Sequence, residues 1–274
     1  MSALPTQLIL SLELLMVLAG CFLLWRHALS PAARLKSQER ASAMPAWDIT
    51  APRFFLFLWL IISGGLLLPA ISVPILKSLA IDESASLIIS GGTFQGGMLL
   101  GILLFKLFFE AKSPNPGQRR SPGRKIQNGL MTFLIALPVL AAVGITWQFL
   151  MGLFGIELVD QDLIAIFANT DSPVLLTCMI LLAAGIAPIT EELIFRAGIF
   201  RYMRTRTPRW VALLGPALLF ASLHANLASF APLAALGIIF SLAYERTGSI
   251  AVPIIAHALF NLNTIVLIFS GVGP

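Results

Sequence analysis

Eight long apolar segments constrain this chain more than any other feature. Of its 274 residues, 58% are hydrophobic and 11% are charged, whereas a soluble domain carries about a quarter charged residues. One helical crossing of a bilayer needs about 20 apolar residues. The segments cover residues 7–25, 54–76, 85–109, 126–154, 173–195, 210–228, 231–245 and 250–270. This pattern predicts a polytopic membrane protein.

The segments are expected to be helices, because backbone groups in lipid must find their hydrogen-bond partners within the segment. The alternation typical of a membrane β-barrel is absent from the sequence. The predicted fold is therefore all-α, a bundle of about eight transmembrane helices, with a long fourth segment and a short seventh one. We expect one integral membrane domain, with N-terminal helices and loops over residues 1–125 and a second group of helices over residues 126–274. Glycine pairs such as Gly64-Gly65 and Gly96-Gly97 should let helices approach closely.

The basic residues predict how the helices are oriented. Every lysine and arginine except Lys77 is assigned to the loops after the first, third, fifth and seventh segments, and the opposite loops are acidic, with Asp82 and Asp160 among others. Because cytoplasmic loops are rich in lysine and arginine, loops 1–2, 3–4, 5–6 and 7–8 are expected in the cytoplasm and both termini outside. The plasma membrane of a bacterium is the expected location. The net charge of +5 then reflects topology and anionic lipid, and no nucleic-acid partner is expected.

The fifth segment ends in the charged motif Glu191-Glu192-Leu-Ile-Phe-Arg196. Charges at membrane depth usually face a partner or a watery cavity. Glu192 and Arg196 are four residues apart on one helical face, so an ion pair is expected. Glu191 points about 100° away and has no local cation. The motif therefore predicts a supporting role for Glu192 and Arg196, and a role as general base for Glu191.

Two further motifs place imidazoles and an amide on apolar segments. Phe220 and His224 are four residues apart on the sixth segment, and His257 and Asn261 are four apart on the eighth. Each pair is expected on one helical face. The fifth, sixth and eighth helices would then contribute to one polar cluster.

The expected depths of these groups in the membrane disagree. The predicted boundaries put Glu191 near the cytoplasmic end of its helix and His224 about 20 Å inward. The groups meet only if the fifth helix is shifted or bent, or if the sixth is offset. A bend is expected at Pro188, which lacks a backbone donor, and it would open room for water.

Taken together, E-E-x-x-x-R at 191–196, F-x-x-x-H at 220–224 and H-x-x-x-N at 257–261 resemble the motifs of the CPBP family, the CAAX prenyl protease 2 and bacteriocin-processing (Abi) group. The resemblance covers roughly residues 173–270, and it implies that residues 126–274 form the catalytic core. It implies an intramembrane endopeptidase of the glutamate type that cuts a membrane-associated peptide or protein, prenylated (CAAX) or bacteriocin-like. By the same resemblance, Glu191 and His224 would activate a water, His257 and Asn261 would form the oxyanion hole, and Glu192, Arg196 and Phe220 would support the site.

The sequence leaves more than one function open. The signatures Gly-x-Ser-Gly, Gly-x-Gly-Asp and His-Glu-x-x-His are absent, so rhomboid, aspartyl and zinc-helix proteases are not supported. No cofactor is expected. The alternative is a zinc-dependent version of the same protease, with Glu191, His224 and His257 as ligands. A transporter that uses these charges as an ion relay, and a catalytically silent protein that binds a membrane partner, are also compatible with the motifs.

Overall fold

The computed structural model describes residues 3–38, 41–79, 81, 83–109, 121–158 and 172–271. Over these residues the chain is mostly helical and has no β-strand, which confirms the all-α prediction. Most of the predicted loop over residues 110–125, and the acidic residues Asp82, Asp160, Asp162 and Asp171, lie outside the described residues. The helices, with η marking a π-helical stretch, are α1 (Ala3–Leu24), η1 (Trp25–Leu29), α2 (Pro31–Gln38), α3 (Ala51–Ser78), α4 (Glu83–Phe108), α5 (Pro122–Leu153), α7 (Pro173–Leu181), η2 (Leu182–Ile186), α8 (Ala187–Glu192), η3 (Leu193–Phe200), α9 (Arg201–Arg204), α10 (Arg209–Leu223), α11 (Leu227–Thr247) and α12 (Ala251–Phe269).

The helix lengths show a multi-pass membrane protein. Within the described part of the chain, seven helical stretches are long and apolar enough to cross a bilayer. The remaining apolar helix, α10, has 15 residues, or about 22 Å. The prediction of about eight crossings is thus close. The predicted long fourth helix is confirmed by α5, which has 32 residues.

The predicted boundary between the sixth and seventh helices was wrong. The short helix is the sixth, α10, whereas the seventh, α11, has 21 residues. The chain turns at Ala225, which has a left-handed backbone with φ of 49°. Asn226 then caps α11, since its Oδ1 accepts a hydrogen bond from the backbone N–H of Ser229 at 2.9 Å. This cap starts the seventh helix four residues earlier than hydropathy indicates.

The fifth crossing is also longer than predicted. It runs without a break through Pro173–Arg204, so Glu191 lies about 20 Å from its basic end. The predicted disagreement in depth between Glu191 and His224 therefore disappears. Arg196 was wrongly assigned to a cytoplasmic loop, because it lies inside η3 and is only 1% exposed.

Pro188 is accommodated by a change in helical hydrogen bonding. The π-helical stretch η2 ends just before it, where the backbone N–H of Ala187 bonds to the carbonyl of Leu182. A proline ring clashes with the carbonyl four residues earlier and cannot donate, and a wider π turn relieves this conflict. A second π stretch, η3, follows Glu192. The short helix α8, which carries both glutamates, is thus enclosed by π-helical segments.

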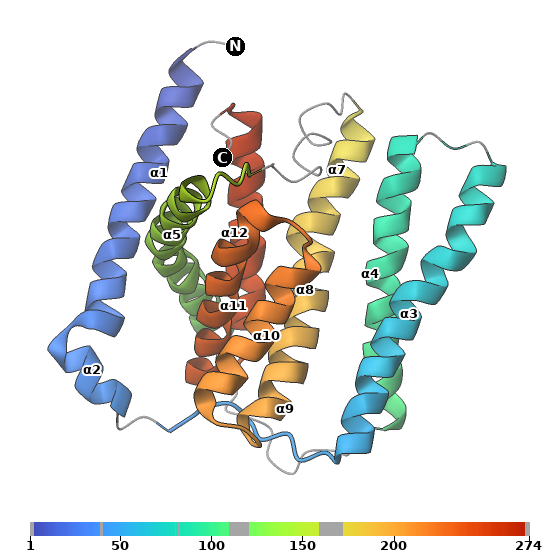
Figure 1. Ribbon diagram of the computed structural model, residues 1–274, viewed down its shortest axis with the longest axis horizontal. Helices are drawn as coiled ribbons and strands as arrows, with labels where there is room; N and C mark the ends of the chain where they lie inside the picture. Colours follow the sequence, from blue (N-terminus) through green and yellow to red (C-terminus); the bar gives the residue numbers. More distant parts are fainter. Residues whose placement is uncertain are drawn as a thin grey trace.

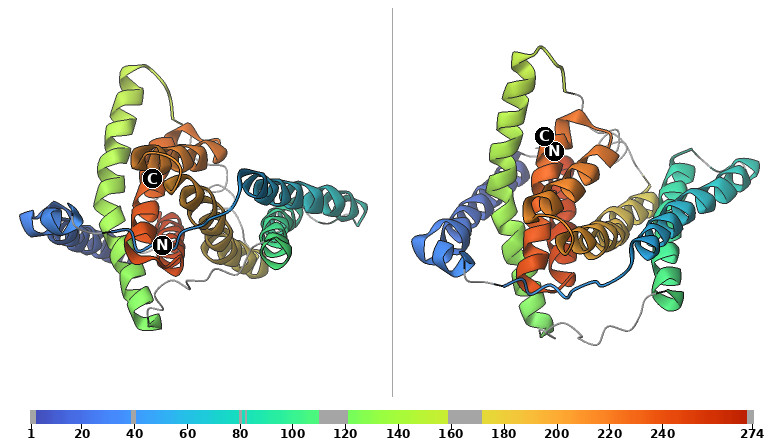
Figure 2. Two further views of the ribbon diagram at one scale, coloured as in Figure 1. Left: turned by 90° about the horizontal axis from the view of Figure 1, so that it is seen from below. Right: turned by 60° about the horizontal axis from the view of Figure 1, so that its bottom comes forward.

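The helices form a central group with two flanks (Figures 1 and 2). One flank is α1 packed on α5, and the other is α3 packed on α4, with α7–α12 between them. The α3–α4 contact depends on glycine, because a Cβ at Gly97 would collide with the carbonyl oxygen of Gly64. This confirms the close approach predicted for these glycines.

The segment 41–50 ties the flanks together at the basic end of the bundle, where it crosses beneath α9–α11 (Figure 1). Arg201 donates hydrogen bonds to the carbonyls of Pro45 and Ala46, both at 2.8 Å. Trp47, 6% exposed, packs edge-on against Phe57 in the core that joins α3 and α4 to η3 and α10. At the opposite end of the bundle, the hydroxyl of Thr6 lies 3.5 Å from the carbonyl of Ser270. The start of α1 and the end of α12 therefore lie on the same side of the bundle.

Candidate active site

The predicted ion pair of Glu192 and Arg196 is present and buried. Arg196 Nη1 donates to Glu192 Oε1 at 2.8 Å, with the side chains 1% and 0% exposed. Glu192 Oε2 and Arg196 Nη2 have no hydrogen-bond partner in the described part of the chain. Burial removes the hydration of both charges, and this cost must be offset by their mutual attraction and by further contacts. The stability of the pair therefore depends on the groups around it.

Aromatic rings surround the buried guanidinium. The Arg196 Cζ lies 4.7 Å from the ring centroid of Phe220 and 5.4 Å from that of Phe240. At these distances the ring faces attract the cation. Both phenylalanines are fully buried. The aromatic shell therefore helps to hold a charge at membrane depth.

His257 lies between the two glutamates. Its Nδ1 lies 2.9 Å from Glu192 Oε1, and its Nε2 lies 3.7 Å from Glu191 Oε2. Because the Glu192 carboxylate pairs with Arg196 and accepts hydrogen bonds, Nδ1 is the donor in the first contact. Nε2 then faces Glu191, whose side chain is partly exposed, at 18% against 0% for Glu192. The imidazole of His257 thus lies between the buried carboxylate of Glu192 and the partly exposed side chain of Glu191.

Asn261 and His257 face the same neighbour, as their spacing predicts. Asn261 Nδ2 donates to the backbone carbonyl of Ala183 in η2 at 2.8 Å. Since α12 runs antiparallel to the fifth crossing, His257 meets Glu192 and Asn261 meets the earlier residue Ala183. The amide nitrogen carries two hydrogens, so this bond uses one of its two donors.

His224 ends α10 and is bound to its own helix. Its Nδ1 lies 2.8 Å from the backbone carbonyl oxygen of Phe220. A carbonyl can only accept, so Nδ1 carries the hydrogen and Nε2 of a neutral ring is left as the base. The imidazole lies 4.6 Å from the Phe220 ring, measured between centroids. The F-x-x-x-H spacing thereby fixes the tautomer of the histidine.

Phe220 is the common neighbour of the predicted site residues. Its ring contacts His224 on one side and His257, at 6.0 Å between centroids, on the other. Glu191, Glu192, Arg196, Phe220 and His257 thus form one continuous cluster, to which His224 is joined through Phe220. The described contacts do not include one between His224 and Glu191. Nor do the described residues contain a group of three or more His, Cys, Asp or Glu side chains placed to hold a metal ion.

Sequence reasoning missed two members of this site. Phe240 on α11 lies 5.3 Å from the His257 ring, measured between centroids, and the carbonyl of Ala183 anchors Asn261. Neither residue carries a local signal, because a phenylalanine in an apolar helix and a backbone carbonyl are ordinary there. The seventh helix was therefore left out of the predicted cluster.

An all-α membrane bundle that gathers a partly exposed carboxylate, a buried ion pair and imidazoles among its apolar helices has side chains of the kinds that an intramembrane hydrolase uses. Comparison with known proteins is consistent with this class. Residues 173–263 match the family described as "Type II CAAX prenyl endopeptidase Rce1-like", the same group as the CPBP family named above. The matched region contains every predicted site residue.

Two curated relatives extend the match beyond this region. "Putative membrane peptidase YdiL" of Bacillus subtilis (strain 168) is 30% identical over 169 residues, which are 62% of this chain and 67% of the relative. "Uncharacterized 24.3 kDa protein" of Escherichia coli is 28% identical over 177 residues, 62% of this chain and 76% of the relative. No solved structure matches the chain. The chain belongs to the Rce1-like family of type II CAAX prenyl endopeptidases, and it is a CAAX-type intramembrane peptide hydrolase.

Proposed function

We propose that this chain is a glutamate-type intramembrane endopeptidase that cleaves a peptide bond in a membrane-associated substrate. The observation that carries the proposal is the unequal burial of two adjacent carboxylates on either side of one imidazole. Glu192 is sealed by Arg196 and His257, whereas Glu191 is partly exposed and lies 3.7 Å from His257 Nε2. A structural ion pair has no need for the second, accessible carboxylate.

In this mechanism Glu191 takes a proton from a water molecule, with His224 as its partner. The water oxygen forms a bond to the scissile carbonyl carbon, and the carbonyl electron pair moves onto its oxygen. Glu191 then passes the proton to the leaving nitrogen as the oxyanion re-forms the C=O bond and the C–N bond breaks, so that the products are a carboxylic acid and an amine. Such general base catalysis is worth about 10²–10⁴-fold in rate. The Nδ1 contact of His224 with Phe220 leaves its Nε2 suited to this task.

His257 and Asn261 are proposed to stabilise the oxyanion. His257 is proposed to act here with a hydrogen on each ring nitrogen, because only then can both nitrogens donate. Its Nδ1–H stays on Glu192, and its Nε2–H faces the same space as Glu191 Oε2, so a substrate oxygen there would lie beside both the donor and the base. The second N–H of Asn261 would supply another donor, while its first N–H stays on Ala183. One donor directed at a developing oxyanion contributes about 3–4 kcal/mol.

We propose that the reaction needs no bound metal, because Glu191 and His257 already supply a base and a donor side by side. The zinc-dependent mechanism would use Glu191, His224 and His257 and requires these side chains to converge on one point, for which the described contacts offer no support. Elemental analysis of purified protein separates the two mechanisms. A stoichiometric, chelator-sensitive zinc ion would overturn the metal-free mechanism.

The proposed substrate is a prenylated or bacteriocin-like peptide or membrane protein that enters from the basic end of the bundle. Arg204, Arg209 and Arg246 lie together at that end, and basic residues mark the cytoplasmic side. We therefore propose the bacterial plasma membrane, with both termini outside. The substrate's lipid-linked part would remain in the bilayer while its peptide reaches Glu191.

The test compares wild type with Glu191→Gln in two assays. Membrane proteomics should reveal uncut precursors in cells that carry the variant. Purified protein in detergent should cut a fluorogenic tail peptide, tested with and without a farnesyl group, and the variant should lose at least about 100-fold in rate. Asp48→Asn, an exposed carboxylate outside the site, is the matched control.

Equal cleavage by wild type and Glu191→Gln would overturn the assignment of the base. Transport across liposomes that is lost with Glu191→Gln, without any cleavage, would establish an ion relay instead of a protease. A phenotype that survives Glu191→Ala, His224→Ala and His257→Ala but fails in destabilised variants would identify a silent binding partner.

A further inference from the structure

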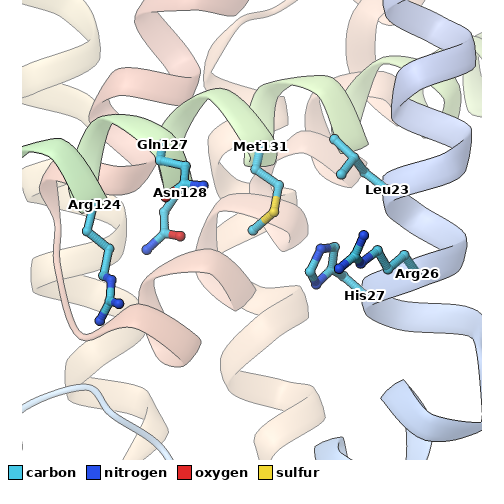
Figure 3. Close-up of a pocket in the computed structure, with 7 residues that line it drawn as sticks. All are labelled: Leu23, Arg26, His27, Arg124, Gln127, Asn128 and Met131. Atoms are coloured by element: carbon cyan, nitrogen blue, oxygen red, sulfur yellow. The ribbon is translucent and has the colours of Figure 1, made fainter.

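Two adjoining cavities lie at the basic end of the bundle, away from the candidate active site. One, of about 460 Å³, lies between the end of α1 with η1 and the start of α5 (Figure 3). The second, of about 510 Å³, lies between η1–α2 and the ends of α9, α10 and α11. Arg26 and His27 line both cavities, so the two adjoin at these residues, and together they are called the recess.

The second cavity carries a large excess of positive charge. Among the described residues its lining contains one carboxylate, Glu245, which accepts from Arg204 Nε at 2.6 Å and from Arg209 Nη2 at 2.7 Å. One carboxylate cannot neutralise two arginines, and the same cavity is also lined by further cations. These are Arg26, Lys36 and Arg246. The recess therefore favours an anion, and guanidinium groups hold a phosphate well because they donate two parallel hydrogen bonds.

The first cavity changes from basic to apolar along both of its walls. On α1, Leu23 precedes Arg26 by one helical turn, and on α5, Met131 lies about 10 Å further into the span than Arg124. Figure 3 shows Leu23 and Met131 on the α1 and α5 walls of the same recess. Beside them, Phe22 and Leu130 are 54% and 46% exposed on the lipid-facing surface. A ligand that matches both ends is anionic at one end and hydrocarbon at the other.

We propose that this recess binds the headgroup of an anionic phospholipid, with an acyl chain along Leu23 and Met131 between α1 and α5. Basic pockets between helices at one membrane surface suit such headgroups. The headgroup would bridge η1 and α2 to the ends of α9, α10 and α11, because α1, η1 and α2 pack mainly on α5 and on each other. A soluble phosphate would satisfy the cations but leave the apolar wall uncovered. The inference does not depend on the proposed catalytic mechanism.

The test uses the full chain purified in a neutral detergent and native mass spectrometry. The probes are dioleoylphosphatidylglycerol, dioleoylphosphatidylcholine and glycerol 1-phosphate. The variant Arg26→Gln/Lys36→Gln/Arg124→Gln removes three exposed cations of the recess. The matched control Arg53→Gln/Lys77→Gln/Lys106→Gln removes three exposed cations that line neither cavity.

Wild type should retain phosphatidylglycerol in preference to phosphatidylcholine, and the first triple variant should bind it at least about tenfold more weakly, since each surface cation contributes about a fivefold factor. The control should change less than about twofold. Met131→Trp, which fills the apolar end without changing charge, should also weaken retention. Unchanged binding by the recess variant, an equal loss in the control, or displacement of the lipid by equimolar glycerol 1-phosphate would each overturn the proposal.

Discussion

The imidazole of His257 and the carboxylate of Glu192 meet across two helices, 65 positions apart in the sequence, with Nδ1 2.9 Å from Oε1. The same oxygen accepts from Arg196 Nη1 at 2.8 Å. One carboxylate oxygen therefore holds both the cation of its own helix and the histidine of α12. Because Nδ1 is held in this way, the Nε2 of His257 is aimed at Glu191.

Removal of one member of the buried pair should destabilise the protein strongly. Glu192→Gln leaves the charge of Arg196 without its partner, and Arg196→Met leaves the charge of Glu192 without its partner. In either case we expect the free energy of unfolding to fall by about 3–5 kcal/mol. The double variant Glu192→Gln/Arg196→Met should lose less than the sum, because no charge is then left unpaired and Met can fill the space between Phe220 and Phe240. The measurement is the unfolding midpoint in detergent for all four proteins. Additive losses would show that the two side chains do not act as a pair.

Two substitutions of His224 should distinguish the roles of its two ring nitrogens. In His224→Asn the amide nitrogen takes the place of Nδ1 and can still donate to the carbonyl of Phe220, but the base at Nε2 is gone. We expect at least about a 100-fold fall in kcat with an unfolding midpoint close to that of wild type. In His224→Gln the bond to Phe220 is lost as well, at about 1 kcal/mol. Turnover at the wild-type rate by His224→Asn would remove this histidine from the chemistry.

The parts of the site that sequence could predict are those set by local helical geometry. The Glu192–Arg196 pair and the His224 contact with the Phe220 carbonyl each join residues four apart, which any helix brings together. The contact of Asn261 with Ala183 and the position of Phe240 arise from how separate helices pack, and no local pattern records that. Arg196 also misled the prediction of where the fifth helix ends, because a count of charges along the sequence does not distinguish a buried arginine from one in a loop. The helix predicted to end at residue 195 therefore continues through Arg204.

The glycines of α4 offer a test of the α3–α4 contact with a built-in control. A methyl group at Gly97 would collide with the carbonyl of Gly64, whereas one at the adjacent Gly96 would meet nothing within 4 Å. We expect Gly97→Ala to destabilise the protein by about 1–3 kcal/mol, as overpacking does. Gly96→Ala should be neutral or stabilising, since alanine favours a helix. Unfolding midpoints in detergent decide the matter, and equal values for the two variants would contradict the close packing of α3 on α4.

Asn261 should affect both stability and turnover, because it has two N–H donors and the structure uses one of them on Ala183. Asn261→Ala removes an interhelical hydrogen bond, worth about 0.6–2 kcal/mol in a membrane protein. If the second donor reaches the oxyanion, kcat should also fall by about 10²–10³-fold, with little change in KM, because the donor would act on charge that develops only in the transition state. Thr264→Ala is a useful control, since it removes a side-chain hydrogen bond one turn further along α12, from Thr264 Oγ1 to the Phe260 carbonyl at 3.1 Å. The control should show a similarly small change in the unfolding midpoint with an unchanged kcat. A variant Asn261→Ala that loses stability but keeps its turnover would limit this residue to holding α12 against the π-helical stretch before Glu191.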